Sequence, residues 1–210
     1  TNKIKSHPKE YSNKLSDKII AVMFYEPSTR TRLSFETAAL KLGAKIITTE
    51  NAGSSSSASK GETIQDSVRV IAGYADALVM RHKSETSAVE AASVNKIPIL
   101  NGGAGKGEHP TQALLDLYTI REKVGRLNNL KVAILGDLVN GRTIHSLIQL
   151  LALYDNIQIY GLSKEAFALP QKYIDMLKQK NVEYTKCYSF EDLPKDLDVM
   201  YHTRIQSERF

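Results

Sequence analysis

The feature of the sequence that most constrains its fold is a group of polar and cationic residues between an apolar segment and a helical pattern. Residues 18–24 are mostly β-branched or aromatic and predict a buried strand. Residues 30–42 predict a helix, with Gly43 as its C-terminal stop. Five consecutive hydrogen-bond donors stand at the junction: Ser28, Thr29, Arg30, Thr31 and Arg32. The junction is therefore a strand-to-helix turn that is rich in donors.

These donors predict an anion-binding site. Ser28 or Thr29 can serve as the N-cap of the helix. A helix N-terminus presents unpaired backbone N–H groups and the positive end of the helix dipole. Arg30 and Arg32 add guanidinium groups, whose geometry matches phosphate oxygens. The alternative is an ordinary helix cap with exposed arginines, but five donors in succession favour a phosphate site.

Composition limits the class of protein. The chain has 210 residues, 42% hydrophobic and 24% charged, which fits one large or two small globular domains. Its start is polar and lysine-rich, its one cysteine is Cys187, and it has no apolar run as long as a membrane helix. We therefore expect a cytoplasmic protein that binds no membrane. The net charge of +5 suits an anionic partner, but the basic residues form no long run, which argues against nucleic acid.

Strand-like and helix-like segments alternate along the chain. Strands are predicted at residues 18–24, 44–49, 76–80, 97–100, 130–135, 157–160, 182–185 and 197–201. Helices are predicted at residues 30–42, 62–74, 84–94, 110–123, 142–154 and 170–180, with a short one near 189–193. In the helix at 110–123, Leu114, Leu117 and Tyr118 are expected to face inward. The alternation predicts an α/β fold of two doubly wound parallel-sheet domains, residues 1–124 and 125–210, with the active site in the cleft between them.

Ligands of open α/β sheets collect at the carboxyl ends of the strands, and cationic residues recur at those ends here. Arg81 follows one strand, and His109 lies at the start of the helix that follows the next. In the second domain, Arg142 begins a helix and Arg204 follows the last strand. Taken singly, each arginine could be a surface cation and the histidine a structural residue. Together they predict two cationic walls, which suit two anionic substrates.

Three loops need separate interpretations. Residues 53–61 read by composition as a flexible serine linker, but they deliver Lys60 to the start of a helix, which favours a functional loop. Residues 101–108 are glycine-rich but fail the Walker pattern, so we interpret them as a loop that permits close approach of the backbone. Residues 136–142 depart from the dinucleotide fingerprint, so no nucleotide cofactor is predicted.

The sequence has no Ser-His-Asp order, no paired carboxylates for hydrolysis and no Cys/His spacing for a metal. We therefore expect no metal and no cofactor. Catalysis would instead depend on positioning and on electrostatic stabilisation of developing charge. Group transfer between two small anions is the reaction class that this chemistry favours.

At five places in order, the sequence resembles the aspartate branch of the carbamoyltransferase family. The matching segments are Ser28-Thr29-Arg30-Thr31-Arg32, Val79-Met80-Arg81-His82, His109-Pro110-Thr111-Gln112, Gly136-Asp137 with Gly141-Arg142-Thr143, and Thr203-Arg204-Ile205-Gln206. The aspartate branch is marked by Lys60-Gly61-Glu62 and by the last segment. Each motif alone is weak, but five in register from Ile19 to Phe210 are highly specific. The ornithine branch is similar but usually lacks that lysine.

The resemblance implies transfer of a carbamoyl group from carbamoyl phosphate to the α-amine of L-aspartate, an early step of pyrimidine biosynthesis. It assigns the phosphate to Ser28, Thr29, Arg30 and Thr31. It assigns polarisation of the carbonyl oxygen to Thr31, Arg81 and His109, and the carbamoyl amide to Gln112. It assigns aspartate to Arg142, Arg204 and Gln206. It also implies that Ser56 and Lys60 reach a neighbouring subunit's site, so the expected minimal unit is a homotrimer.

The resemblance implies a chain that continues past Phe210, and it is compatible with regulatory chains or pathway enzymes as partners. Two rival functions stay open at this point. A homologue that binds phosphate without catalysis would give no product. A nucleic-acid-binding protein, suggested only by the basic charge, would show a steep salt dependence of its affinity.

Overall fold

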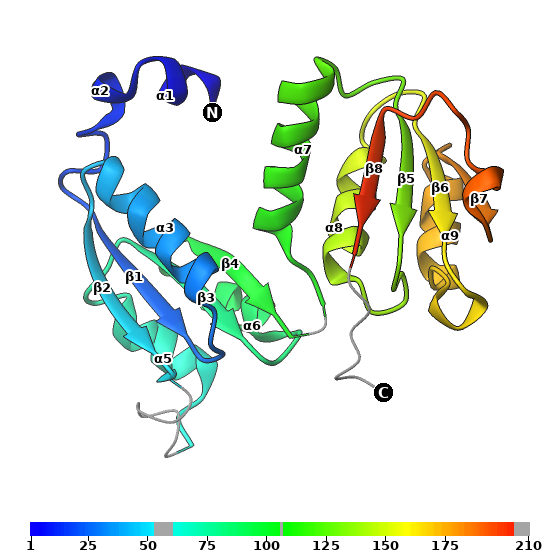
Figure 1. The fold of residues 1–210 in the computed structure, drawn as a ribbon. Helices are drawn as coiled ribbons and strands as arrows, with labels where there is room; N and C mark the ends of the chain where they lie inside the picture. Colours follow the sequence, from blue (N-terminus) through cyan, green and yellow to red (C-terminus); the bar gives the residue numbers. More distant parts are fainter. Residues whose placement is uncertain (53–60, 106, 204–210) are drawn as a thin grey trace. The chain divides into compact units, whose positions relative to one another are not determined.

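The computed structural model describes residues 1–52, 61–105 and 107–203 (Figure 1). The chain divides into two compact units, residues 1–107 and 108–210. Each unit contains a four-stranded sheet in which every described strand pair is parallel. The predicted α/β class and its two parallel sheets are thereby confirmed.

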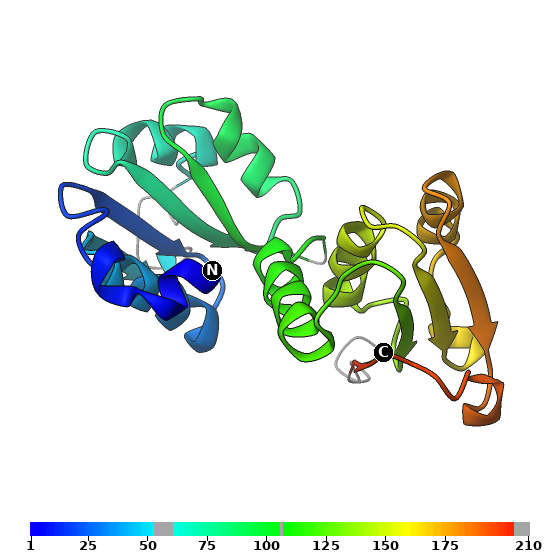
Figure 2. The ribbon, with the colours of Figure 1, turned by 90° about the horizontal axis from the view of Figure 1, so that it is seen from above.

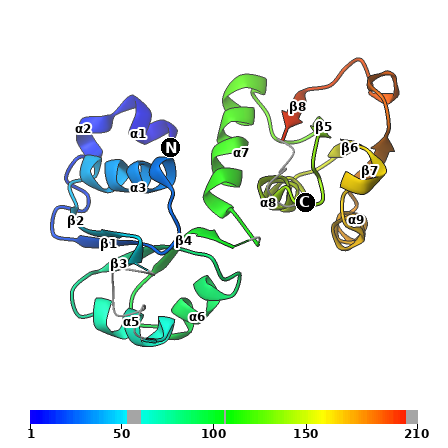
Figure 3. The same ribbon diagram turned by 60° about the horizontal axis from the view of Figure 1, so that its bottom comes forward.

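The first unit is a three-layer arrangement of helices around a sheet. Its elements are α1 (Asn2–Ser6), α2 (Pro8–Tyr11), β1 (Ile19–Phe24), α3 (Thr29–Lys41), β2 (Lys45–Glu50), α5 (Ile64–Ile71), β3 (Ala77–His82), α6 (Ser87–Ser93) and β4 (Ile99–Ala104). The strand order is β2-β1-β3-β4. Figure 3 shows α3 on one face of this sheet and α5 with α6 on the other.

The alternation of side chains along β1 builds both layers of the first unit. Val22 and Phe24 are fully buried and belong to the cluster that Phe35 of α3 joins. Ala21 points to the opposite face, where it packs in the cluster that contains Val68 of α5. Both faces of the strand are therefore removed from water, as expected for a parallel sheet covered by helices on both sides.

The second unit is built around its own sheet. Its elements are α7 (Pro110–Val124), β5 (Lys131–Leu135), α8 (Arg142–Leu151), β6 (Gln158–Leu162), η2 (Glu165–Phe167), α9 (Gln171–Gln179), β7 (Glu183–Cys187), η3 (Phe190–Asp192) and β8 (Val199–His202). The strand order is β7-β6-β5-β8. Figure 2 shows α8 and α9 on the same side of this sheet. Val132 and Ile134 of β5 face these helices, whereas Ala133 and Leu135 face a smaller cluster that contains Cys187.

Helix α7 packs with the second unit. Its buried side chains Ala113, Leu117 and Ile120 belong to the same core cluster as Leu147 and Leu151 of α8. The division by packing therefore falls before α7, at residues 107 and 108, whereas the sequence analysis expects a domain boundary after it, at residue 124. The physical reason is that the apolar face of α7 meets α8, a contact between helices that are separated by a strand in the sequence.

Two details of the sequence analysis are corrected by the structure. Gly102 and Gly103 were expected in a loop but lie inside β4, because β4 continues its pairing with β3 past a register shift between Met80 and His82. Leu114 was expected to face inward on α7 but is 59% exposed, because Ala113 and Leu117 occupy the face that meets α8.

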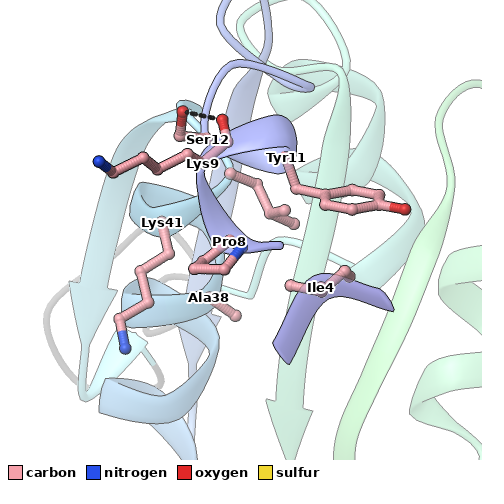
Figure 4. A pocket seen from close by; sticks show the side chains of 8 residues that line it. Ile4, Pro8, Lys9, Tyr11, Ser12, Ala38 and Lys41 are labelled. Atoms are coloured by element: carbon pink, nitrogen blue, oxygen red, sulfur yellow. Dashed lines mark hydrogen bonds between the residues drawn. The ribbon is translucent and has the colours of Figure 1, made fainter. Parts of the chain in front are cut away.

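The N-terminal helices cover the end of α3. A groove of about 520 Å³ lies among Ile4, Pro8 and Tyr11 on one side and Ala38 and Leu42 on the other (Figure 4). These side chains are mostly apolar, and the groove lies at the opposite end of α3 from Ser28. The groove is therefore separate from the predicted anion site.

Candidate functional site

The predicted phosphate site lies at the topological switch point of the first sheet. From β1 the chain crosses to β2 on one side, and from β3 it crosses to β4 on the other. Phe24, the last residue of β1, is paired with Arg81 of β3, and the backbone N–H of Tyr25 donates to the carbonyl of Arg81 at 2.8 Å. The turn that follows β1 and the cation of β3 are therefore neighbours at the place where open α/β sheets bind ligands.

The donors at the start of α3 are not used within the described part of the chain. Ser28 is the N-cap, but its hydroxyl makes no capping bond. The side chains of Ser28, Thr29, Arg30 and Thr31 form no hydrogen bond or ion pair with the described residues, and the hydroxyl of Ser34 donates only to the backbone carbonyl of Thr31, at 2.7 Å. Arg30 is exposed to solvent. The hydroxyls, the guanidinium and the helix N-terminus are thus available to an anion.

Arg32, the fifth donor of the run, has a structural role instead. Its Nε lies 3.8 Å from Glu36 on the same helix, and its Nη1 lies 3.3 Å from Glu50 of β2. Glu36 also accepts a hydrogen bond from Thr48 of β2 at 2.7 Å. These contacts join α3 to the edge of the sheet, so only the first four donors of the run remain as candidates for binding phosphate.

Arg81 is a buried cation. It is 6% exposed, which excludes the alternative that it is an ordinary surface residue. Its Nη1 donates to the carbonyl of Gly102 at 3.3 Å, and its Nη2 lies 3.5 Å from the carboxylate of Glu26. Its Nε–H has no acceptor among the described residues. A buried guanidinium with an unused donor, beside an open helix N-terminus, can polarise an oxygen of a bound ligand.

The glycines of β4 make room for Arg81. Gly103 has a positive φ of 128°, and a Cβ at this position would lie 2.8 Å from Nη1 of Arg81. The sequence analysis expected these glycines to allow close backbone approach to a ligand. In the described structure they allow close approach to the arginine, which they hold against the sheet.

The second unit has a corresponding switch point between β5 and β8. Leu135 is paired with His202, and the backbone N–H of Thr203 donates to the carbonyl of Leu135 at 2.8 Å. Gly136 has a positive φ of 106°, and a side chain there would overlap the carbonyl oxygen of Thr203. The segments that carry Arg142 and Arg204 in the sequence therefore begin at adjacent strand ends.

A buried carboxylate shapes the turn before Arg142. Asp137 is fully buried, and its Oδ1 accepts from the backbone N–H of Asn140 at 2.9 Å. The side-chain amide of Asn140 donates to both oxygens of Asp137, at 3.1 and 3.3 Å. Gly141 then caps α8, which Arg142 begins. The turn thereby delivers Arg142 to a helix N-terminus, as predicted.

His145 fastens the same turn to α8. Its Nε2 lies 2.8 Å from the carbonyl oxygen of Leu138, and its ring stacks on Tyr173 with centroids 4.1 Å apart. Burial lowers the pKa of His145, which favours the neutral ring. Because a carbonyl can only accept, Nε2 must carry the hydrogen of this bond.

His109 and Gln112 stand at the start of α7. His109 is the N-cap residue, and its backbone N–H donates to the hydroxyl of the buried Ser146 on α8 at 2.9 Å. Gln112 donates from Nε2 to Asp116 one turn later, at 2.9 Å. Both predicted residues are therefore held by side chains of the second unit.

The structure leaves part of the predicted site untested and adds residues that the sequence analysis missed. Ser56, Lys60, Arg204 and Gln206 lie outside the described residues. Three residues for which the sequence predicted no role are Glu26, Asp116 and Asp137. Two of these residues could have been identified from the sequence. Glu26 lies close to the run of donors, and Asp137 directly follows Gly136.

Two further observations concern metals and membranes. Within residues 1–52, 61–105 and 107–203, no three His, Cys, Asp or Glu side chains form a group that could hold a metal ion. No described helix combines the length and the apolar character needed to cross a bilayer.

These observations define an α/β protein with two parallel sheets, in which a group of hydrogen-bond donors at the start of α3 stands at the switch point of the first sheet. Comparison with known proteins identifies the family. Residues 1–122 match the family described as aspartate/ornithine carbamoyltransferase, carbamoyl-P binding domain. The chain therefore belongs to the aspartate/ornithine carbamoyltransferase family.

Individual relatives agree with this assignment. The chain is 51% identical over 196 residues to the aspartate carbamoyltransferase catalytic subunit of Methanocaldococcus jannaschii, covering 93% of this chain and 64% of that protein. A solved structure of the M. jannaschii catalytic subunit superposes with a TM-score of 0.92 at 48% identity, over 100% of this chain and 69% of the other. The Trypanosoma cruzi aspartate transcarbamoylase in complex with carbamoyl phosphate and aspartate has a TM-score of 0.86 at 36% identity, over 98% and 68% of the two chains. The chain thus spans about two thirds of the length of these relatives.

Proposed function

We propose that this protein transfers the carbamoyl group of carbamoyl phosphate to the α-amine of L-aspartate, giving N-carbamoyl-L-aspartate and phosphate, a step of pyrimidine biosynthesis. The observation that carries the proposal is a group of donors at the start of α3, whose side chains have no partner among the described residues, beside the buried Arg81 at the switch point of a parallel sheet. Family membership supports the same reaction, since relatives that align with 93% and 98% of this chain carry this activity in their names.

In the proposed mechanism, the first domain, residues 1–124, binds carbamoyl phosphate. Ser28, Thr29, Arg30 and Thr31 hold the phosphate. Thr31, Arg81 and His109 donate to the carbonyl oxygen. The amine nitrogen forms a bond to the carbonyl carbon, and the C–O bond to phosphate breaks with its electron pair on the phosphate oxygen. The proton that the amine loses passes to the departing phosphate. Donors fixed in advance act most strongly where charge develops in the transition state.

In this proposal the second domain, residues 125–210, binds aspartate. Arg142, Arg204 and Gln206 bind the two carboxylates, and Gln112 contacts the carbamoyl amide. Support comes from the second switch point, where Gly136 and Thr203 bring the two arginine-bearing segments to adjacent strand ends. No metal or other cofactor takes part.

The proposed function is tested by assaying carbamoyl transfer by the full-length protein to aspartate and to ornithine in parallel. We expect product with aspartate only. Calorimetric titration with a phosphonate joined to aspartate should give one tight site per chain, because such a mimic engages both groups of donors at once. Transfer to ornithine alone would contradict the specificity. Binding of the mimic without any product would favour a non-catalytic homologue.

We further propose a cytoplasmic homotrimer in which Ser56 and Lys60 complete the site of a neighbouring subunit, with regulatory chains or pathway enzymes as additional partners. The test is complementation between two inactive variants, Lys60→Ala and Arg30→Ala. In an equal mixture of the two variants, about one quarter of the sites should be restored. Each such site combines an intact Arg30 from one subunit with an intact Lys60 from its neighbour, and each residue is intact in half of the subunits. Mixtures that stay inactive, although mass measurements show mixed trimers, would contradict shared sites.

A further inference from the structure

A chain of hydrogen bonds in the second unit links a predicted ligand residue to two residues that have no assigned role. Gln112 and Asp116 lie one turn apart on the same face of α7, and Nε2 of Gln112 lies 2.9 Å from Oδ1 of Asp116. The other carboxylate oxygen, Oδ2, accepts from the hydroxyl of Tyr201 on β8 at 3.1 Å. The carboxylate is therefore held from two sides by two different elements.

In both hydrogen bonds to Asp116, the carboxylate is the acceptor and its partner is the donor. Burial raises the pKa of Tyr201 to about 12, so its hydroxyl is a donor at neutral pH. Burial also raises the pKa of Asp116, but the donors Gln112 and Tyr201 oppose this change by stabilising the ionised carboxylate. An ionised carboxylate can only accept hydrogen bonds. It therefore requires the NH₂ end of the Gln112 amide to face it.

The hydrogen bond to Asp116 determines which end of the Gln112 amide can face a ligand. A glutamine side chain has one donor end and one acceptor end, and the two can exchange by rotation of the amide. With Nε2 bound to Asp116, the carbonyl oxygen Oε1 is the end presented away from it. A ligand beside Gln112 therefore meets a hydrogen-bond acceptor, which suits an N–H group.

We infer that Asp116 is a positioning residue that fixes the amide of Gln112 with its carbonyl oxygen toward the ligand, and that this orientation selects an acyl phosphate carrying an NH₂ group over one carrying a methyl group. The inference rests on the proposed function, in which Gln112 contacts the carbamoyl amide. Without Asp116, the amide can turn either end toward the ligand, and ordering it on binding costs side-chain entropy.

The test compares the affinity of carbamoyl phosphate with that of acetyl phosphate, which has a methyl group in place of NH₂. In the full-length protein, Asp116→Leu is expected to lower the preference for carbamoyl phosphate about tenfold, while inhibition by inorganic phosphate stays within about twofold of the parent value. Tyr201→Phe is the matched control. It removes a hydrogen bond to the same carboxylate but keeps the bond to Gln112, so the preference should change by less than about twofold.

Three more variants separate the possible outcomes. Gln112→Ala measures the preference for carbamoyl phosphate that remains without the amide. The double variant Gln112→Ala, Asp116→Leu should show the same preference as Gln112→Ala alone. Asp116→Asn serves if the leucine variant does not fold, since its amide can donate to Gln112 as well as accept and should also lower the preference. If the preference is lost in Gln112→Ala but kept in a folded Asp116 variant, the role of Asp116 is wrong and the proposed function still stands. A parent protein that does not prefer carbamoyl phosphate overturns the proposed function instead.

Discussion

Replacing Arg30 by alanine is expected to lower kcat/KM for carbamoyl transfer by about two to three orders of magnitude, as loss of a charged donor to a reacting anion typically does. The free energy of unfolding should stay within about 0.5 kcal/mol of the parent value. The reason for the second expectation is structural. Arg30 is exposed and has no side-chain partner among the described residues, so no native contact is lost.

Arg32→Ala is the matched control, because it removes the same side chain two residues later. Here we expect a loss of about 1 kcal/mol in the free energy of unfolding, since the partly buried guanidinium joins Glu36 of α3 to Glu50 of β2. Its effect on kcat/KM should be smaller than that of Arg30→Ala by at least about tenfold. Urea unfolding and steady-state kinetics measure the two effects separately. Equal losses of activity in the two variants, or an Arg30→Ala protein with full activity, would show that the phosphate assignment is wrong.

The pair also shows what could be predicted from the sequence. The strand-to-helix turn was predictable, because the apolar run of β1 and the Gly43 stop are local signals. The separation of Arg30 from Arg32 was not, because the partner Glu50 belongs to a strand that pairs with β1 only in the folded chain. A run of donors therefore indicates an anion site, but tertiary contacts decide which donors remain available.

The same distinction applies to α7. Its start was predictable from Pro110, which suits the first turn of a helix, and its C-terminal stop is Gly125 in the left-handed conformation. Its inward face was predicted only in part. Leu117 is buried as expected, but Leu114 is exposed, because α8 meets the side of the helix that carries Ala113. The bond between Asp116 and Tyr201 joins residues 85 positions apart, and no local pattern indicates it.

The arrangement of the two switch points could be predicted from a general rule for parallel sheets and not from a local sequence pattern. Parallel strands place their carboxyl ends at one edge, so residues that follow neighbouring strands must meet there. Arg81 and Arg204 were both predicted to follow strands, but Arg81 is the next-to-last residue of β3. The structure pairs Phe24 with Arg81 in the first sheet. It pairs Leu135 with His202, two residues before Arg204, in the second.

The largest expected effect on stability follows from the second of these junctions. Gly136→Ala should destabilise the second unit by about 3 kcal/mol or more. Gly136 has a φ of 106°, a conformation that disfavours any side chain, and a Cβ there would overlap the backbone carbonyl of Thr203. That carbonyl cannot move away freely, because the N–H of the same residue is bonded to Leu135 at 2.8 Å.

Gly125→Ala separates the two causes of that loss. Gly125 also has a positive φ, of 83°, but a Cβ there would meet no atom within 4 Å. Its replacement should cost only the conformational penalty, about 1 kcal/mol. Chemical unfolding of both variants measures the difference. A difference of about 2 kcal/mol or more assigns the excess to the contact with Thr203, and equal losses would contradict it. Because Arg142 and Arg204 follow the two segments that meet at this contact, Gly136→Ala should also raise KM for aspartate in any folded fraction, whereas Gly125→Ala should leave KM unchanged.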